Sequence, residues 1–145
     1  MKEFVYLMCP ITTLIICQII KFILESYDSK KLKWGRLFNG SGGMPSSHTS
    51  LTFSITFLIG LKLGFESPLF AIPLVYSLIT AYDAMGLRRE SGRQAAIINQ
   101  ILDELFSKES KTGIIHLKEQ VGHQPLEVLA GIILGIGMAF LFSII

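Results

Sequence analysis

Two apolar runs separated by three residues decide the fold of this chain: SHTSLTFSITFLIGLKLG at residues 47–64 and PLFAIPLVYSLITAYDAM at residues 68–85. Each run is close to the roughly 20 helical residues that are needed to cross a hydrocarbon core of about 30 Å. Because the connection is so short, the two helices are expected to run antiparallel as a hairpin. The centre of the chain is therefore predicted to lie in a membrane.

Two further apolar runs lie at the ends of the chain, at residues 4–24 and 126–145. Half of the 145 residues are apolar and the mean hydropathy is +0.54, which is too high for a soluble domain of this size. No small-residue cleavage site follows the first run, so we interpret it as a mature helix rather than a signal peptide. The predicted fold is all-α, an integral membrane bundle of about four transmembrane helices in a single domain, residues 1–145.

The distribution of positive charge predicts the orientation. Eleven of the 13 Lys and Arg residues lie at one face of the predicted bundle, whereas only Lys2 and Lys62 lie at the other. Cytoplasmic loops carry the excess of Lys and Arg, so the motif-bearing face is predicted to be cytoplasmic and both termini to lie outside the cell membrane. The formal net charge of +2 gives no overall basic field, and no nucleic-acid partner is expected.

An amphipathic helix is predicted at about residues 93–106, in the second long cytoplasmic connection. Apolar residues recur there at helical spacing, at Ile97, Ile98, Ile101, Leu102, Leu105 and Phe106. Polar residues fill the opposite side, at Arg93, Gln94, Gln100, Asp103 and Glu104. Periodicity is compatible with a helix in the membrane interface and with one that covers the cytoplasmic mouth of the bundle.

The segment SGGMPSSH, residues 41–48, enters the second helix from the cytoplasmic face. The hydroxyls of Ser46 and Ser47, together with the free N–H groups of a helix start, are suited to binding an anion. His48 is placed to give or take a proton there. The alternative is an ordinary capped helix start with an interfacial histidine.

The segment GHQPLE, residues 122–127, enters the last helix from the same face. Glu127 is expected near the helix start, close enough to accept an N–H of His123. A histidine held in this way becomes a better base or nucleophile. The alternative is a glutamate that caps the helix and a histidine in a turn.

A third polar segment, residues 82–94, leaves the third apolar run on that face. Arg88, Arg89 and Arg93 can bind phosphate through bidentate contacts. Asp83, at the edge of the hydrocarbon, is costly unless it is paired, and one of these arginines is its expected partner. The alternative reading of the arginines is a cytoplasmic anchor, which leaves Asp83 unexplained.

No metal and no cofactor are predicted. Cys9 and Cys17 lie two helical turns apart in the first apolar run, beyond the reach of a disulfide and without neighbouring ligands at metal-binding spacing. They are interpreted as buried apolar residues, and His116 as a lone surface histidine.

The three segments together resemble the divergent branch of the type 2 phosphatidic acid phosphatase superfamily, which is related to acid phosphatases and vanadium haloperoxidases. The resemblance covers nearly the whole chain and depends on MPSSH at 44–48, GHQPLEV at 122–128, the following Gly131 and Gly135, and the stretch 83–94. It implies that His123 is the phosphorylated nucleophile, that Glu127 orients it, and that His48 protonates the leaving oxygen.

The superfamily's arginine motifs are missing. Its Lys-x6-Arg-Pro motif is absent because Leu37 follows Arg36, and its Ser-Arg pair falls on His116 and Leu117. Phosphate binding would then depend on other cations, which we predict to be Arg36, Arg88, Arg89, Arg93 and Lys118.

These observations predict a metal-independent hydrolase of a membrane lipid phosphate or diphosphate that acts through a phosphohistidine. The rival hypothesis is a catalytically silent protein that binds or moves anionic lipid with the same cationic surface. A third is a small structural subunit, and a homodimer is compatible with so short a bundle.

Overall fold

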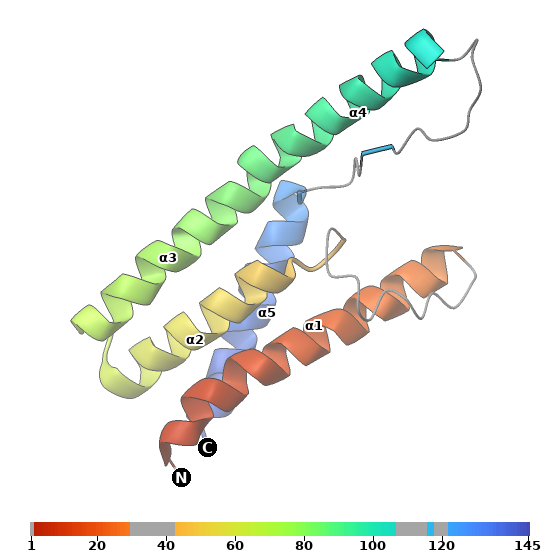
Figure 1. Cartoon of the computed structure of the whole chain (residues 1–145). Helices are drawn as coiled ribbons and strands as arrows, with labels where there is room; N and C mark the ends of the chain where they lie inside the picture. Colours follow the sequence, from red (N-terminus) through yellow and green to blue (C-terminus); the bar gives the residue numbers. More distant parts are fainter. Residues whose placement is uncertain (1, 30–42, 107–115, 118–121) are drawn as a thin grey trace.

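The computed structural model describes residues 2–29, 43–106, 116–117 and 122–145, and these parts are helical apart from short connections. The elements are η1 (Lys2–Phe4), α1 (Val5–Ser29), α2 (Ser47–Leu63), α3 (Pro68–Met85), α4 (Leu87–Phe106) and α5 (Pro125–Ser143). Helices α1, α2, α3 and α5 form a bundle, and α4 continues the line of α3 beyond it (Figure 1). The predicted all-α membrane bundle is confirmed.

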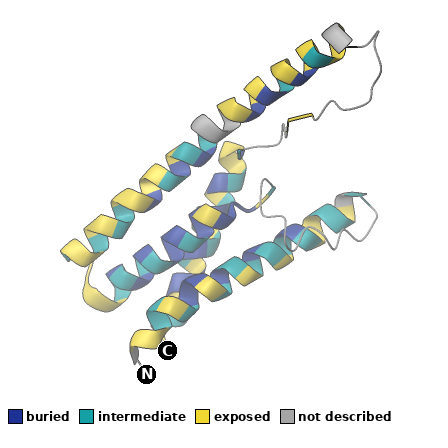
Figure 2. Ribbon diagram, viewed as in Figure 1, coloured by how far each residue is buried: buried dark blue, intermediate teal, exposed yellow. Residues whose placement is uncertain are grey.

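Within the described residues, three stretches are long and apolar enough to cross a membrane: Val5–Tyr27, Pro68–Glu104 and Pro125–Ser143. Helix α2 has 17 residues, just short of such a span, and packs against α1, α3 and α5. It carries much of the buried surface, whereas α1, α3 and α5 expose apolar side chains outward (Figure 2). The predicted hairpin is present, because α2 and α3 run antiparallel through a turn at residues 64–67 (Figure 1).

The buried side of α2 is rich in hydroxyls: Ser47, Thr49, Ser50, Thr52, Ser54 and Thr56. Several of them donate to a carbonyl one turn earlier, as Thr56 Oγ1 does to Thr52 O at 2.8 Å. Thr56 Oγ1 also lies 2.9 Å from Ser77 Oγ of α3. Small hydroxyl residues allow close helix packing in lipid and bond within and between helices. Helix α2 is therefore suited to the middle of the bundle despite its polar content.

Gly131 and Gly135 allow α5 to lie directly against α2. A Cβ atom on Gly131 would lie 2.7 Å from Ser46 O, and one on Gly135 would lie 2.6 Å from Ser50 O. Both distances are shorter than any carbon-to-oxygen contact that a packed side chain makes. The four-residue spacing of the two glycines is the small-xxx-small pattern of closely packed membrane helices.

Helix α4 differs from its prediction in one respect: it begins at Leu87, not near residue 93. Gly86 ends α3 with a bond from its N–H to Tyr82 O, but the chain resumes a helix at once. Sequence reasoning treated residues 82–94 as a polar segment that leaves α3 and did not predict that helix α4 covers most of it.

Helix α4 leads away from the bundle rather than across its end (Figure 1). The 37 residues of Pro68–Glu104 would extend about 55 Å at the helical rise, well beyond a hydrocarbon core. The apolar side chains of Ile97, Ile98 and Ile101 are exposed on it. Periodicity was compatible with a helix in the membrane interface and with one across the mouth of the bundle. In the structure, α4 does not cover the mouth.

Candidate functional site

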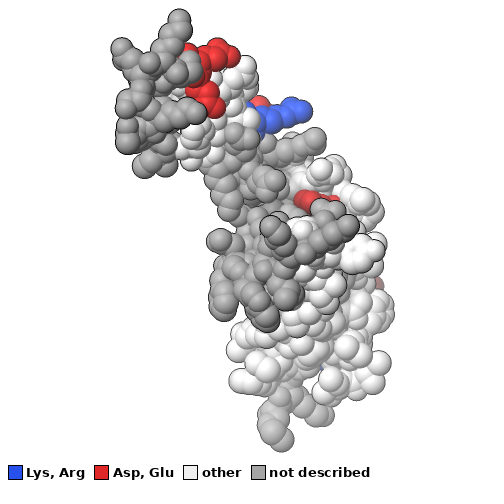
Figure 3. Space-filling view, turned by 90° about the vertical axis from the view of Figure 1, so that its right-hand side faces the viewer, with Lys and Arg blue, Asp and Glu red and all other residues white. Residues whose placement is uncertain are grey.

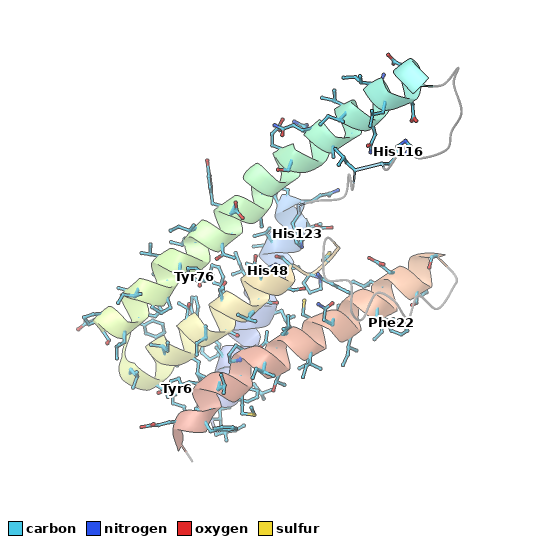
Figure 4. The ribbon with its side chains drawn as sticks, in the orientation of Figure 1. Tyr6, Phe22, His48, Tyr76, His116 and His123 are labelled. Carbon is cyan, nitrogen blue, oxygen red and sulfur yellow. The ribbon has the colours of Figure 1, made fainter. Side chains whose placement is uncertain are left out.

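Backbone hydrogen bonds join the three polar segments at one end of the bundle. The N–H of Ser46, just before α2, donates to Glu127 O in the first turn of α5 at 2.9 Å. The N–H of His123 donates to Ala84 O in the last turn of α3 at 3.1 Å. His48 and His123 therefore come from different elements at the same end of the molecule (Figure 4).

His123 is a buried residue, with 6% of its surface exposed. It follows Gly122, whose φ of 121° lies in a region that side-chain-bearing residues rarely adopt. The glycine thereby turns the chain so that His123 lies between the end of α3 and the start of α5. A buried imidazole at a helix N-terminus can attack an anionic phosphoryl group from which water is excluded.

Glu127 caps helix α5. Its Oε2 atom accepts the N–H of Gln124 at 3.0 Å, and its own N–H donates to Gln124 O at 3.0 Å. Helix capping was the alternative interpretation of Glu127, and these two hydrogen bonds show that Glu127 does cap α5. The role of Glu127 in orienting His123 stays a prediction.

The start of α2 combines two buried hydroxyls with an exposed histidine. Ser46 and Ser47 are buried, and Ser46 Oγ lies 2.9 Å from Thr49 Oγ1. His48, in the first turn, is exposed at the end of the bundle. The arrangement suits a general acid that exchanges protons with water while the hydroxyls face inward.

A buried lysine reaches this helix start from α1. Lys21 is 1% exposed, and its Nζ donates to Ser47 Oγ at 2.7 Å. Cys17, one turn earlier, has its Sγ 3.4 Å from Pro45 O and 3.6 Å from Ser47 Oγ. A buried ammonium group that donates to a hydroxyl in the first turn of a helix is a strong attractor for an anion.

Sequence reasoning missed this cation, because it counted Lys21 only as part of the positive cytoplasmic face and Cys17 only as an apolar residue. A signal was present. The residues Cys9, Thr13, Cys17 and Lys21 recur every four positions on one side of α1, and all are buried. A lysine at the end of such a row, inside an apolar run, is by default a candidate for function.

The predicted phosphate-binding arginines are only partly placed. Arg93 is exposed on α4, and its Nη1 atom lies 3.8 Å from Glu90 Oε2 in a surface ion pair that contributes little to stability. Arg88 and Arg89 lie in the first turn of α4. Arg36 and Lys118 lie outside the described residues.

Other predicted polar residues lie near the same end. Asp83 is half-buried in the last turn of α3, next to the Ala84 carbonyl that binds His123. On the face seen in the space-filling view, the described charged side chains lie mainly toward the α4 end (Figure 3). His116 is not a lone histidine, because its Nε2 lies 3.0 Å from Asp103 Oδ1.

An apolar groove of about 670 Å³ begins beside the site. Its walls are the second half of α3 and the first turns of α5, and Phe53 of α2 also lines it. The lining residues of α3 and α5 are Leu78, Ile79, Ala81, Tyr82, Met85, Pro125, Val128, Leu129 and Ile132. Pro125 is two residues from His123, so the groove starts where the polar site ends. Its size falls in the range of small-molecule sites, about 300–1,000 Å³.

Comparisons with known proteins place the chain in a family. The model of the divergent PAP2 family matches residues 3–138. The chain is also similar to the uncharacterized membrane protein YuiD of Bacillus subtilis (strain 168), with 35% identity over 150 aligned residues that cover 94% of each chain. No solved structure matches it. This chain is therefore a multi-pass membrane protein that belongs to the divergent PAP2 family.

Proposed function

We propose that this protein is a membrane-embedded phosphatase that hydrolyses a lipid phosphate or diphosphate through a phosphohistidine at His123. The observation that carries the proposal is the pair of backbone bonds that join the ends of α2, α3 and α5 beside a buried lysine. In this proposal the two histidines, the two buried hydroxyls and the lysine at this end of the bundle act together on one phosphoryl group.

The phosphoryl group would bind at the start of α2. The N–H groups of the first helical turn have no partner within the helix and favour an anion. Ser46 and Ser47 add hydroxyl donors, and Lys21 adds a positive charge that is already held toward Ser47 by a hydrogen bond. Lys21 would thus provide positive charge in place of the superfamily's missing arginine motifs. Arg36, Arg88, Arg89, Arg93 and Lys118 stay predicted ligands.

The reaction would proceed in two displacements. In the first, an imidazole nitrogen of His123 attacks phosphorus in line, the bond from phosphorus to the lipid oxygen breaks, and His48 gives its proton to that oxygen. In the second, water attacks the phosphohistidine, gives a proton to His48 and releases inorganic phosphate. His48 is thereby restored as an acid. Lys21 and the helix N-terminus stabilise the charge on the equatorial oxygens in both steps.

The apolar groove supports a lipid rather than a soluble substrate. It runs along α3 and α5 from Pro125 to Ile132, seven residues or about 10 Å of helix. A hydrocarbon tail lying in it would be parallel to the neighbouring lipid chains while the head group reaches His123. Partition of the substrate into the bilayer would then deliver it sideways to the site.

The test compares two substrates in the wild type, two histidine variants and one control variant. Wild type, His123→Ala and His48→Ala are purified in detergent, mixed with phosphate-labelled phosphatidic acid and quenched rapidly. Wild type should carry acid-labile, base-stable phosphate, and His123→Ala should carry none. His48→Ala should lose about 10² to 10⁴-fold on the alkyl phosphate, but far less on nitrophenyl phosphate, whose leaving group needs no proton. Gln100→Ala, on the exposed side of α4, serves as the control.

A specific observation favours a second function, a catalytically silent protein that binds or moves anionic lipid. The carboxylate of Glu127 is engaged in capping α5, and the superfamily's arginine motifs are missing. Wild-type protein that binds phosphatidic acid but releases no phosphate, and never becomes phosphorylated, would support this function instead.

The orientation is part of the proposal: the site faces the cytoplasm and the termini lie outside. Cysteine at Gln100 should react with an impermeant reagent only from the cytoplasmic side, and cysteine at Glu66 only from outside. Both positions are exposed. Reaction of the two from the same side would exclude the arrangement.

A further inference from the structure

Helices α2 and α3 both begin after a serine in the N-cap position, but the two serine side chains differ in what they bind. Their backbones are alike, with φ −67° and ψ 117° at Ser46 and φ −72° and ψ 139° at Ser67. Ser67 caps α3, because its Oγ accepts the N–H of Leu69 at 3.2 Å. The side chain of Ser46 makes no such bond to α2. A residue type that is among the best N-caps therefore leaves its helix without a side-chain cap.

Thr49 accounts for this difference. Its Oγ1 lies 2.9 Å from Ser46 Oγ, and both residues are completely buried. Thr49 is the third residue of α2, whereas the third residue of α3 is Phe70, which has no hydroxyl. The hydroxyl of Thr49 thus engages the Ser46 oxygen that would otherwise accept an N–H of the first turn.

Helix α5 holds the two hydroxyls in place. The N–H of Ser46 donates to Glu127 O at 2.9 Å. A Cβ atom on Gly131 would lie 2.7 Å from Ser46 O and 3.2 Å from Thr49 Cβ, so the backbone of α5 packs directly against this pair. Because the pair is sealed from water, each hydroxyl satisfies the other and neither can turn to solvent instead.

A helix start without a side-chain cap favours an anion. The first N–H groups of a helix have no partner within it, and a serine cap would occupy one of them. Without that cap they remain directed outward at the positive end of the helix dipole. Lys21 adds positive charge at the same turn, because its Nζ donates to Ser47 Oγ at 2.7 Å. A phosphoryl group offers several acceptor oxygens to such a site.

We propose that Thr49 is a positioning residue for the phosphoryl group: it holds the Ser46 hydroxyl away from the first-turn N–H groups and keeps them open for phosphoryl oxygens. This role rests on the proposed function, because it belongs to the same phosphate site. When Thr49 donates to Ser46 Oγ, the Ser46 proton is left for a phosphoryl oxygen. The bound phosphoryl group then takes the place of the cap.

The first experiment measures binding and not turnover. Thr49→Val keeps the shape of the side chain but removes its hydroxyl, so that Ser46 Oγ is released to cap α2. Inorganic phosphate, titrated by calorimetry in detergent at one pH, should bind about fivefold more weakly, the factor that one capping bond provides. The Tm without phosphate should stay level or rise, because the helix gains a cap. A hydroxyl with only a structural role would show the reverse, a lower Tm with phosphate affinity kept.

Two further variants identify the cause. Thr52→Val is the matched control, because Thr52 is buried on the same helix and its Oγ1 donates to Thr49 O at 3.2 Å. It should leave phosphate affinity unchanged. Thr49→Ser should restore the affinity of the wild type, because it restores the hydroxyl. Failure of Thr49→Ser to restore affinity would overturn the proposal.

The second experiment repeats Thr49→Val in a Ser46→Ala background. Alanine cannot cap α2, so the loss of the Thr49 hydroxyl should then change phosphate affinity by less than about twofold relative to Ser46→Ala alone. A fivefold loss in both backgrounds would show that Thr49 does not act through Ser46. If Thr49→Val does not fold, Thr49→Ala provides the same two comparisons with a smaller side chain.

The outcomes separate this proposal from the phosphatase. Phosphatidic acid in mixed micelles is the second probe, and an equal loss for both probes assigns the effect to the phosphoryl group that they share. A wild type that binds phosphate with this dependence on Thr49, but forms no phosphoenzyme, refutes the phosphatase alone. Unchanged phosphate affinity in Thr49→Val, a loss for the lipid alone, or a wild type that binds neither probe refutes the role of Thr49, whatever the turnover.

Discussion

Replacing Gly135 by alanine tests the contact on which the bundle is built. The added methyl group would lie 2.6 Å from Ser50 O and 3.0 Å from Phe53 Cβ and Ser54 N. Ordinary contact begins near 3.4 Å, so the two helices must separate by close to 1 Å. These are mostly backbone atoms of the central helix, which cannot rotate away as the end of a side chain can.

Two opposing effects determine the size of the change. Overpacking of this kind costs about 1–3 kcal/mol, whereas alanine is better than glycine in a helix by about 1 kcal/mol. We therefore expect Gly135→Ala to be destabilised by up to about 2 kcal/mol. Gly137 is the control on the same helix, because a Cβ atom there meets nothing within 4 Å. Gly137→Ala keeps only the gain in helix propensity and should be unchanged or slightly more stable.

The assay is thermal unfolding of the two variants and the wild type in one detergent. Since 1 kcal/mol shifts the Tm of a chain of this size by about 2–4 °C, Gly137→Ala should melt several degrees above Gly135→Ala. Equal melting temperatures would refute the close approach of α2 and α5, and with it the bond that brings Ser46 to Glu127.

Four other changes separate function from stability. Gly131→Ala should reduce phosphoenzyme formation more than Gly135→Ala does, because its methyl group would press on the Ser46 carbonyl at the site; the measurement is rapid-quench labelling. Lys21→Met should lower kcat/KM for lipid phosphate at least tenfold while the Tm stays level or rises, since a buried charge stabilises a fold poorly; a falling Tm with intact turnover would contradict a binding role. Glu127→Gln should lower the free energy of unfolding by less than about 1 kcal/mol, as loss of a charge at a helix start does. If the same variant also forms far less phosphoenzyme than the wild type, Glu127 orients His123 as well as capping α5. Thr56→Val should cost about 1 kcal/mol by breaking the hydroxyl link to α3, with activity unchanged.

The apolar runs and their connections were sufficient to predict the bundle. Hydropathy reports on the solvent around a whole segment, and the three residues between the central runs allow only an antiparallel hairpin. Local cues failed where they compete: Gly86 indicated the end of α3 correctly, but it did not indicate that a new helix begins at Leu87. The polar residues that follow are good helix formers, and they outweigh one poor position.

The sequence by itself determined an all-α membrane protein of the divergent PAP2 type, with three polar segments at one end of the bundle. It could do so because hydropathy, charge asymmetry and short motifs are properties of neighbouring residues. Only the tertiary structure decided that Lys21 faces Ser47 and that Asn99 holds Leu117. These contacts join residues 26 and 18 positions apart. Such partners are selected by the packing of whole helices against one another, and no local pattern of residues encodes which face of one helix meets which residue of another.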